Sequence, residues 1–225
     1  MKLIKWGLLL LIVLSFGCAM LNTHVVLFYP PLPGKSAINE DPTVTKPHIA
    51  NRSFIVEVID KREEKILAVT SVWKPGGKPV TWVEADNDPA QWVKQAICFH
   101  LKQSGCCTVD ATEKPAYTLI CTLNELTSYE LPPSKIPAYA YFVGTTKRVK
   151  ATGICVNIEL KNNSKILCSS HIDGDYIIEE SALKSKEHET NFFALALQNA
   201  CIKTMNLIEE CIAKEENKTK DNKGN

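Results

Sequence analysis

The chain has 225 residues, of which 26 are basic and 25 are acidic, so its net charge at pH 7 is only +1. Basic residues form no stripe along the chain, which excludes nucleic acid from the expected partners. Hydrophobic residues make up 45% of the sequence, an ordinary share for a globular protein and enough for one buried core.

The first 18 residues have the order of a secretory signal. Lys2 and Lys5 precede an apolar run over residues 8–14, and small residues lead from that run to Cys18. The run is shorter than the roughly 20 apolar residues that a transmembrane helix needs. An uncleaved signal anchor is the alternative, because signal and anchor differ mainly in length and flanking residues. We predict a signal peptide over residues 1–17.

Cys18 stands where this signal would be cleaved. The segment resembles a bacterial lipobox, in which the cysteine is acylated and becomes the first residue of the mature chain. The resemblance implies that Cys18 carries acyl chains such as palmitate. Two chains suffice for stable anchoring, whereas one gives only marginal binding. Ala19 in the next position implies transfer to the outer membrane, with the protein facing the periplasm.

Eight further cysteines follow, and an exported chain meets conditions in which disulfides form. Eight cysteines permit 105 complete pairings, so the sequence predicts one or two disulfides without choosing them; one option ties the adjacent Cys106 and Cys107 to another element. Neither a Cys-x-x-Cys motif nor a paired histidine spacing is present. We therefore expect no metal site and no cofactor.

In chain order, residues 18–50 are expected to form the lipidated N-terminus and a linker that contains one short strand. The domain itself is predicted over residues 51–213. Apolar alternation and turn residues predict strands over 24–29, 52–60, 66–73, 80–83, 117–126, 149–160 and 165–176. In the strand at 52–60 both faces carry apolar residues, which is typical of a central strand buried on both sides.

Two helices are predicted. The first begins at Asp88, which can cap it, continues with Pro89 and with Gln91 as a capping-box residue, and ends at Gly105. The second spans residues 190–213 and has apolar residues at helical spacing, while residues 214–225 are polar enough to be a disordered tail. These elements predict an α+β fold: a mixed, mostly antiparallel sheet of about five or six strands with both helices on one face.

Two groups of residues are candidates for binding a partner. Tyr139, Tyr141 and Phe142 lie in a proline-rich loop over residues 130–146, and such aromatic residues are common at the centres of interfaces. A loop that simply folds onto the sheet is an equal alternative. Asp60 and Arg62 follow a strand, where they form either a recognition pair or an ordinary surface ion pair of about 0–1 kcal/mol.

A third group suggests chemistry. His171, Asp173 and Asp175 stand close together, and they would suit a cation or an acid and base. A hydrolase would also need a nucleophile, for which Ser169 and Ser170 are nearby. No Gly-x-Ser-x-Gly motif surrounds these serines, and Asp-Gly-Asp is ordinary turn chemistry. We expect no catalytic residues and no enzyme activity.

The pattern as a whole resembles the YajG-type family of bacterial periplasmic lipoproteins. The residues concerned are the lipidated cysteine, the strand over 54–59 with Asp60-x-Arg62 at its end, the segments 87–105 and 115–119, and the terminal helix. The resemblance implies a lipoprotein without catalytic residues that can be carried over. The resulting hypothesis is a non-catalytic binding or accessory module at the outer membrane with an envelope protein or lipid partner. The alternative is an accessory subunit of lipid transport that holds an apolar ligand between helices and sheet.

Overall fold

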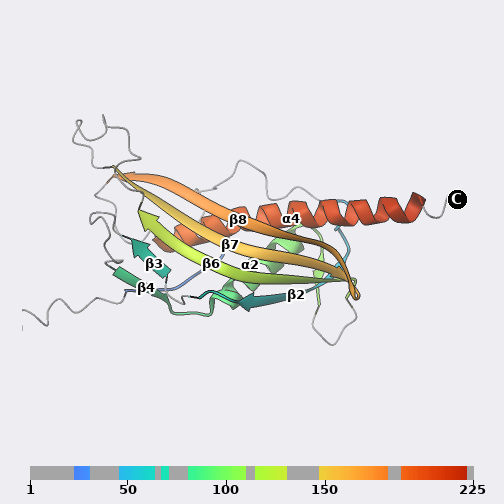
Figure 1. Cartoon of the computed structure of the whole chain (residues 1–225), viewed down its shortest axis with the longest axis horizontal. Coiled ribbons are helices and arrows are strands. Elements are labelled where there is room, and N and C mark those ends of the chain that lie inside the picture. The colour runs from blue at the N-terminus through green and yellow to red at the C-terminus, as the bar shows by residue number, and fades with distance from the viewer. Residues whose placement is uncertain are drawn as a thin grey trace, which may run out of the picture.

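The computed structural model describes residues 23–30, 46–63, 67–70, 81–109, 115–130, 147–181 and 189–221. These residues form two layers, a long twisted sheet and two helices that lie side by side on one of its faces (Figure 1). The predicted α+β class is thereby confirmed, together with the mixed sheet and the position of both helices. We call the sheet face that the helices leave uncovered the open face.

The sheet contains eight strands, of which five have five or more residues. Three are very short, with two to four residues each; two of them overlap the strands predicted over 24–29 and 66–73, and the two-residue strand at 107–108 is too short for patterning to predict. The strands are β1 (Thr23–Val25), β2 (Ser53–Asp60), β3 (Leu67–Thr70), β4 (Thr81–Ala85), β5 (Cys107–Thr108), β6 (Tyr117–Glu130), β7 (Lys147–Asn162) and β8 (Lys165–Ser181).

The centre of the sheet is β6, which pairs with three other strands. Along one edge β6 pairs antiparallel with β7, and β7 pairs with β8 through a two-residue turn in which Asn163 has a φ of 52°. Two-residue hairpin turns require a positive φ, and asparagine tolerates this conformation. Along the other edge β2 and β3 follow one another, both parallel to β6. The longest ladders are antiparallel, as predicted.

The first helix, α2 (Pro89–Gln103), has the predicted ends. Asp88 accepts a hydrogen bond from the main-chain N–H of Ala90 at 2.9 Å, and Gly105 has a φ of 80°, a conformation that glycine adopts without strain. Trp92, Ile97 and other apolar residues of α2 are buried against β2 and α4.

The second helix, α4 (Glu189–Asp221), is longer than predicted. Its apolar residues from Phe193 to Ile212 are buried as expected, but the helix continues to Asp221, so the predicted disorder is wrong for residues 214–221. Polar composition alone indicated a tail. Side chains on these turns, Glu215 and Glu216, bond to Lys165, His48 and Arg52 of the domain, which explains why the helix persists.

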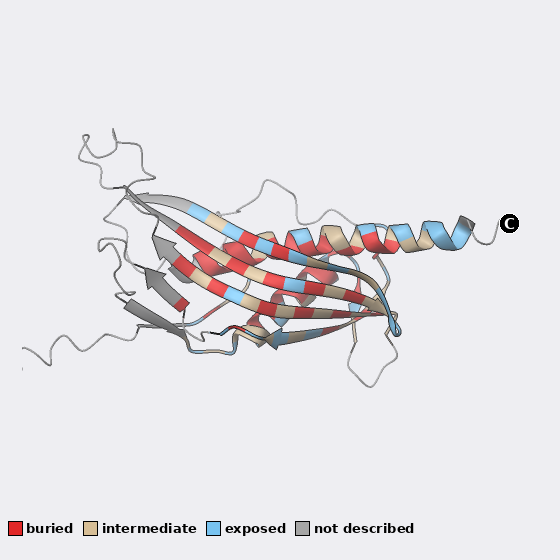
Figure 2. Ribbon diagram, viewed as in Figure 1, coloured by how far each residue is buried: buried red, intermediate tan, exposed pale blue. Residues whose placement is uncertain are grey.

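Burial alternates along the long strands (Figure 2). The inward residues of β6 and β7 are those that the alternation predicts, with Leu119, Leu123 and Leu160 fully buried. The outcome for β2 is different. Phe54 is buried, but Ile59 on the other face is 45% exposed, so burial on both sides is wrong. Both helices lie on one face, and nothing in the sequence of a single strand reveals that.

Part of the expected linker belongs to the domain. Strand β1 pairs with β4, and Leu27 is buried where its main chain exchanges hydrogen bonds of 2.9 and 2.8 Å with the Asn87 side chain. Ile49 is fully buried as well, in a turn that lies on α4. Residues 23–30 and 46–50 are therefore structural, and a linker over all of 18–50 is wrong for them.

One disulfide is present among the described cysteines. Cys168 of β8 and Cys211 of α4 are joined across 43 residues, with Cα atoms 6.3 Å apart, so the bond fixes the helix to the sheet. The prediction of one or two disulfides is confirmed. The option that ties Cys106 and Cys107 to another element is wrong, because both are free thiols. The buried Cys106 instead donates to the main-chain oxygen of Ile49 at 3.2 Å.

Neither α2 nor α4, the two described helices, is apolar enough over a sufficient length to cross a membrane.

Candidate functional site

A cluster of reactive side chains lies on the open face, where β7 and β8 pair. Cys155 and Asn157 alternate along β7, and His171 and Asp173 alternate along β8; the register sets Asn157 opposite His171 and Cys155 opposite Asp173. The Cys155 Sγ lies 3.4 Å from His171 Nε2, and that nitrogen lies 3.1 Å from an Asp173 carboxylate oxygen. We call Cys155, His171 and Asp173 the Cys155 cluster.

Asn157 fixes the orientation of the histidine ring. Its side-chain oxygen lies 2.8 Å from His171 Nδ1. Because an amide oxygen only accepts hydrogen bonds, Nδ1 carries the proton of this contact. Nε2, the other ring nitrogen, therefore turns toward the thiol and the carboxylate.

An irregularity in β6 brings two more polar residues to the cluster. The β6–β7 register shifts between Leu123 and Glu125, so that Asn124 is an extra residue beside Cys155. Bulges of this kind redirect side chains and are common next to functional sites. The Asn124 side-chain nitrogen lies 3.9 Å from the Cys155 Sγ, and Glu125 pairs with Cys155 across the strands.

The Cys155 thiol is not activated as a nucleophile. Partial burial is the main cause and raises its pKa; the hydrogen bond from Asn124 lowers the pKa, and the carboxylates of Asp173 and Glu125 raise it further. Reactive cysteines have the opposite environment, in which positive charge lowers the thiol pKa. The arrangement therefore suits holding a cation better than attacking a substrate.

The sequence analysis selected only part of this cluster. His171 and Asp173 come together as expected, but Asp175 does not join them, and Ser170 only bonds to a main-chain oxygen. The residue that the sequence analysis missed is Cys155. It stands 16 residues before His171, and only the hairpin register places the two side by side. A cysteine on the outward face of a predicted strand was the available signal.

Asp60 and Arg62 form a buried pair at the end of β2. The guanidinium donates to both carboxylate oxygens at 2.9 and 2.8 Å, a bidentate geometry, and the two side chains are 11% and 3% exposed. The alternative of an ordinary surface ion pair is therefore wrong, because the pair is covered by protein. Contact of this pair with a partner stays a prediction. Tyr139, Tyr141 and Phe142 lie outside the described residues, as does Cys18.

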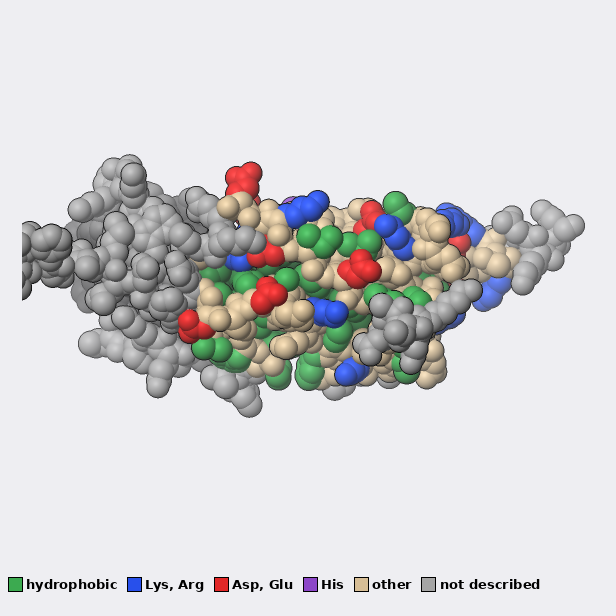
Figure 3. All heavy atoms as spheres, turned by 90° about the horizontal axis from the view of Figure 1, so that it is seen from below, with side chains coloured by type: hydrophobic (Ala, Val, Ile, Leu, Met, Phe, Trp, Pro, Cys, Tyr) green, Lys and Arg blue, Asp and Glu red, His purple; other side chains and the backbone are tan. Residues whose placement is uncertain are grey.

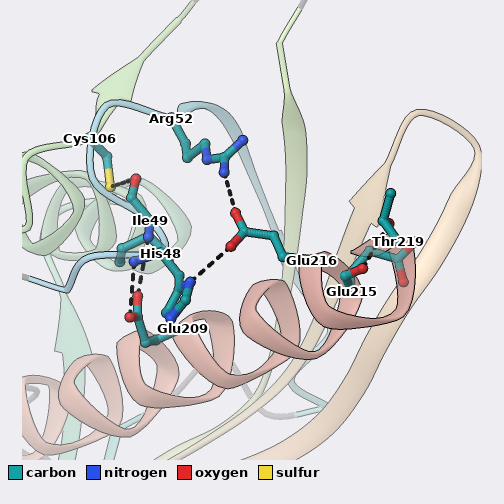
Figure 4. A network of polar contacts seen from close by, with 8 residues as sticks. All are labelled: His48, Ile49, Arg52, Cys106, Glu209, Glu215, Glu216 and Thr219. Carbon is teal, nitrogen blue, oxygen red and sulfur yellow. Dashed lines mark hydrogen bonds and ion pairs between the residues drawn. The ribbon is translucent and has the colours of Figure 1, made fainter. Parts of the chain in front are cut away.

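A second polar network attaches the turn over residues 46–51 to α4 (Figure 4). The Glu209 carboxylate accepts the main-chain N–H groups of His48 and Ile49 at 3.0 and 3.2 Å. Glu216, two turns further along the same face of α4, binds His48 Nδ1 at 2.9 Å and also pairs with Arg52. The hydrogen bond from His48, and then the charge of Arg52, lower the pKa of Glu216. The network is structural, because each carboxylate is already paired.

Next to this network lies a shallow cavity of about 310 Å³. Its lining residues come from β6, the β7–β8 turn and the last turns of α4: Tyr117, Asn162, Glu215, Glu216, Thr219 and Lys220. Glu215 bonds to Lys165 at 2.7 Å, and Glu216 is paired within the network. Both carboxylates of the cavity therefore already have partners within the domain.

The layer between the helices and the sheet is filled by side chains. Phe54, Trp92, Leu119 and Ile208 are each at most 1% exposed there. His100 is buried in the same layer, and its ring bonds to the Tyr29 hydroxyl. This packing favours a binding module over the alternative in which an apolar ligand lies between helices and sheet.

The described surface seen from the side of β2 and β4 is mixed in character (Figure 3). Hydrophobic side chains gather in its middle, with acidic and basic side chains among them. Exposed apolar residues occur on β2 and β8, with Ile59, Ile166 and Ile177 exposed by 45%, 53% and 62%. Interfaces commonly combine apolar and charged groups in this way.

The sequence matches no family model, and no curated protein matches it either. Among solved structures, a Xanthomonas campestris protein of the DUF330 family superposes with a TM-score of 0.51 at 10% identity, over 87% of this chain and 99% of that one. A hypothetical protein from Chlamydia trachomatis gives a TM-score of 0.45 at 8% identity, over 73% and 99%. A minor lipoprotein from Acinetobacter baumannii gives 0.42 at 5% identity, over 72% and 92%.

The likeness to the Xanthomonas protein shows a shared fold, and at 10% identity it shows the fold alone. Bacterial lipoproteins are among the structures similar to this chain. The resemblance to the YajG-type family stays a prediction.

Proposed function

We propose that this protein is a lipid-anchored component of the bacterial cell envelope that acts by binding a partner at the periplasmic face of the outer membrane. The observation that carries the proposal is the N-terminal signal, Lys2 and Lys5 followed by the apolar run 8–14 and Cys18. The protein acts as a binding or accessory module without catalysis. In support, the thiol of the best-formed polar cluster is not activated.

The structure gives this anchor a geometric consequence. Strand β1 begins at Thr23, so only residues 19–22 separate Cys18 from the sheet. The five steps of chain from Cys18 to Thr23 span at most about 18 Å when extended. An acylated Cys18 would therefore hold β1 and its neighbour β4 near the bilayer surface. The C-terminal end of α4 lies at the opposite end of the long axis (Figure 1).

The same end of the sheet flanks the predicted binding segment. Strand β6 stops at Glu130 and β7 starts at Lys147, and just before that gap Ser128 pairs with β3. Tyr139, Tyr141 and Phe142 belong to the chain that joins β6 to β7. Both ends of that connection thus lie at the end of the domain that carries β3 and β4. Strand β1, which follows Cys18 most closely in the sequence, pairs with β4 at the same end.

Metabolic labelling with radioactive palmitate tests the anchor. We expect label in the wild-type protein and in Cys107→Ser, which loses an exposed thiol elsewhere, and none in Cys18→Ala. Cys18→Ala should also leave the membrane fraction. Label that persists in Cys18→Ala would refute acylation at this residue.

Photocrosslinking in intact cells tests the binding role. A photoreactive residue at Tyr139 is expected to capture one defined envelope protein or lipid, whereas the same residue at Ser164, exposed at the β7–β8 turn, should not. Equal products from both positions, or none from Tyr139, would count against a partner at the 131–146 segment.

A further inference from the structure

We propose that Cys155, His171 and Asp173 form a three-ligand site for a divalent transition-metal ion such as Zn²⁺, with solvent in the fourth position. This inference is independent of the proposed function, since it concerns the open face and not the anchor. The three donor atoms, one each of sulfur, nitrogen and oxygen, all lie within 4.8 Å of one another. Zinc accepts all three donor types.

Two of the three donor separations in the Cys155 cluster are close to those of a tetrahedral site. Bonds of about 2.3 Å to sulfur, 2.05 Å to nitrogen and 2.1 Å to oxygen at tetrahedral angles set the donors about 3.6 Å apart for S···N and about 3.4 Å for N···O. The observed separations are 3.4 Å from Cys155 Sγ to His171 Nε2 and 3.1 Å from that nitrogen to the Asp173 oxygen. Both separations are within a few tenths of an ångström of the tetrahedral values, and the sulfur and the carboxylate oxygen lie within 4.8 Å of each other.

The orientation of the His171 ring suits metal binding. Asn157 accepts the Nδ1 proton of His171, so Nε2 is the ring nitrogen that faces the Cys155 sulfur and the Asp173 carboxylate. Nε2 is therefore the atom of this ring that a metal ion would bind. When a metal ion binds, the Cys155 S–H proton passes to the buffer and the sulfur binds as thiolate.

The surroundings complete the site in two ways. Metal-bound histidines commonly donate their second ring N–H to an oxygen that orients them, which is the role Asn157 has here. Glu125, opposite Cys155, adds negative charge beside the donors. One cation is near, since the Lys203 ammonium donates to the main-chain oxygen of Asp173 at 2.6 Å. That contact leaves the Asp173 carboxylate available to a metal.

Cobalt titration of the full-length chain tests the site, because a thiolate bound to Co²⁺ gives a charge-transfer band in the near ultraviolet. The titration is done under nitrogen without reductant, which keeps the Cys168–Cys211 disulfide intact. We expect the wild-type protein to develop this band with one Co²⁺ per chain, and Zn²⁺ to abolish it. Cys107→Ser, which removes another exposed thiol, should behave as the wild type.

Variants of the cluster decide the outcome. Cys155→Ser should lose the band, and Asn157→Ala should bind about 10- to 100-fold more weakly, as expected when an orienting partner is removed. Should Cys155→Ser fold poorly by circular dichroism, Asp173→Asn serves instead, with at least tenfold weaker binding expected. No band in the wild type, or a band unchanged in Cys155→Ser, would mean that only a proton occupies the cluster and would overturn the proposal.

Discussion

The close packing of α4 against β8 depends on Gly174, which has no side chain. A Cβ added at Gly174 would lie 2.3 Å from the main-chain oxygen of Ala196, 2.7 Å from the Ala200 Cβ and 2.8 Å from a methyl carbon of Ile154. Real Cβ atoms do not approach other atoms this closely, so in Gly174→Ala the helix has to move away from the strand. The Cys168–Cys211 disulfide joins the same two elements and limits that movement.

The expected cost follows from two opposing effects. Overpacking of a core costs about 1–3 kcal/mol, and three contacts below 3.0 Å favour the upper end of that range. Replacing a strand glycine by alanine gains about 0.5–1 kcal/mol in backbone entropy. We therefore expect Gly174→Ala to lower the free energy of unfolding by about 2 kcal/mol, which for a domain of this size lowers Tm by about 4–8 °C.

Gly153 on β7 is the matched control. A Cβ there would lie 3.5 Å from an Asp175 carboxylate oxygen and 3.9 Å from the Thr127 hydroxyl, which are ordinary contacts. Gly153→Ala should therefore leave the free energy of unfolding unchanged or raise it by up to about 1 kcal/mol. Urea unfolding followed by circular dichroism measures both variants. If Gly174→Ala proves as stable as Gly153→Ala, α4 does not contact β8 at Gly174 and the packing argument is wrong.

Two further predictions concern stability. Replacing both Cys168 and Cys211 by alanine should lower the free energy of unfolding by about 3–4 kcal/mol, because the bond closes a long loop. The variant should give the same urea unfolding curve with and without reductant, whereas reductant should destabilise the wild-type protein. If reductant leaves the wild-type curve unchanged, the disulfide does not stabilise the fold. Burial lowers the pKa of His100 from 6.5 to about 4, so the unfolded chain binds the proton first as the pH falls. Stability should therefore decline between about pH 6.5 and pH 4, by at most about 3 kcal/mol, and His100→Gln should remove this part of the decline. Superimposable pH profiles of urea unfolding for the two proteins would show that His100 is not the cause.

The sequence by itself determined the local elements. Alternation in β6 and β7 identifies their inward residues, because the period of two is a property of any extended strand. Asp88 and Gly105 set the ends of α2, because capping and positive φ depend on individual residue types. The predicted signal that ends at Cys18 is likewise contained in a contiguous stretch. Each of these features depends on residues that are near one another in the chain.

Only the tertiary structure decided what depends on distant pairs. The last turns of α4 are polar, and they hold because Glu216 meets His48 and Arg52 more than 160 residues away in sequence. Ile59 is 45% exposed on the open face, although the composition of β2 predicts burial on both sides. The Cys155 cluster exists because the hairpin register, with an irregularity in the neighbouring strand, brings together side chains 16 or more residues apart. Register and layer order are set by the whole core, and no local pattern encodes them.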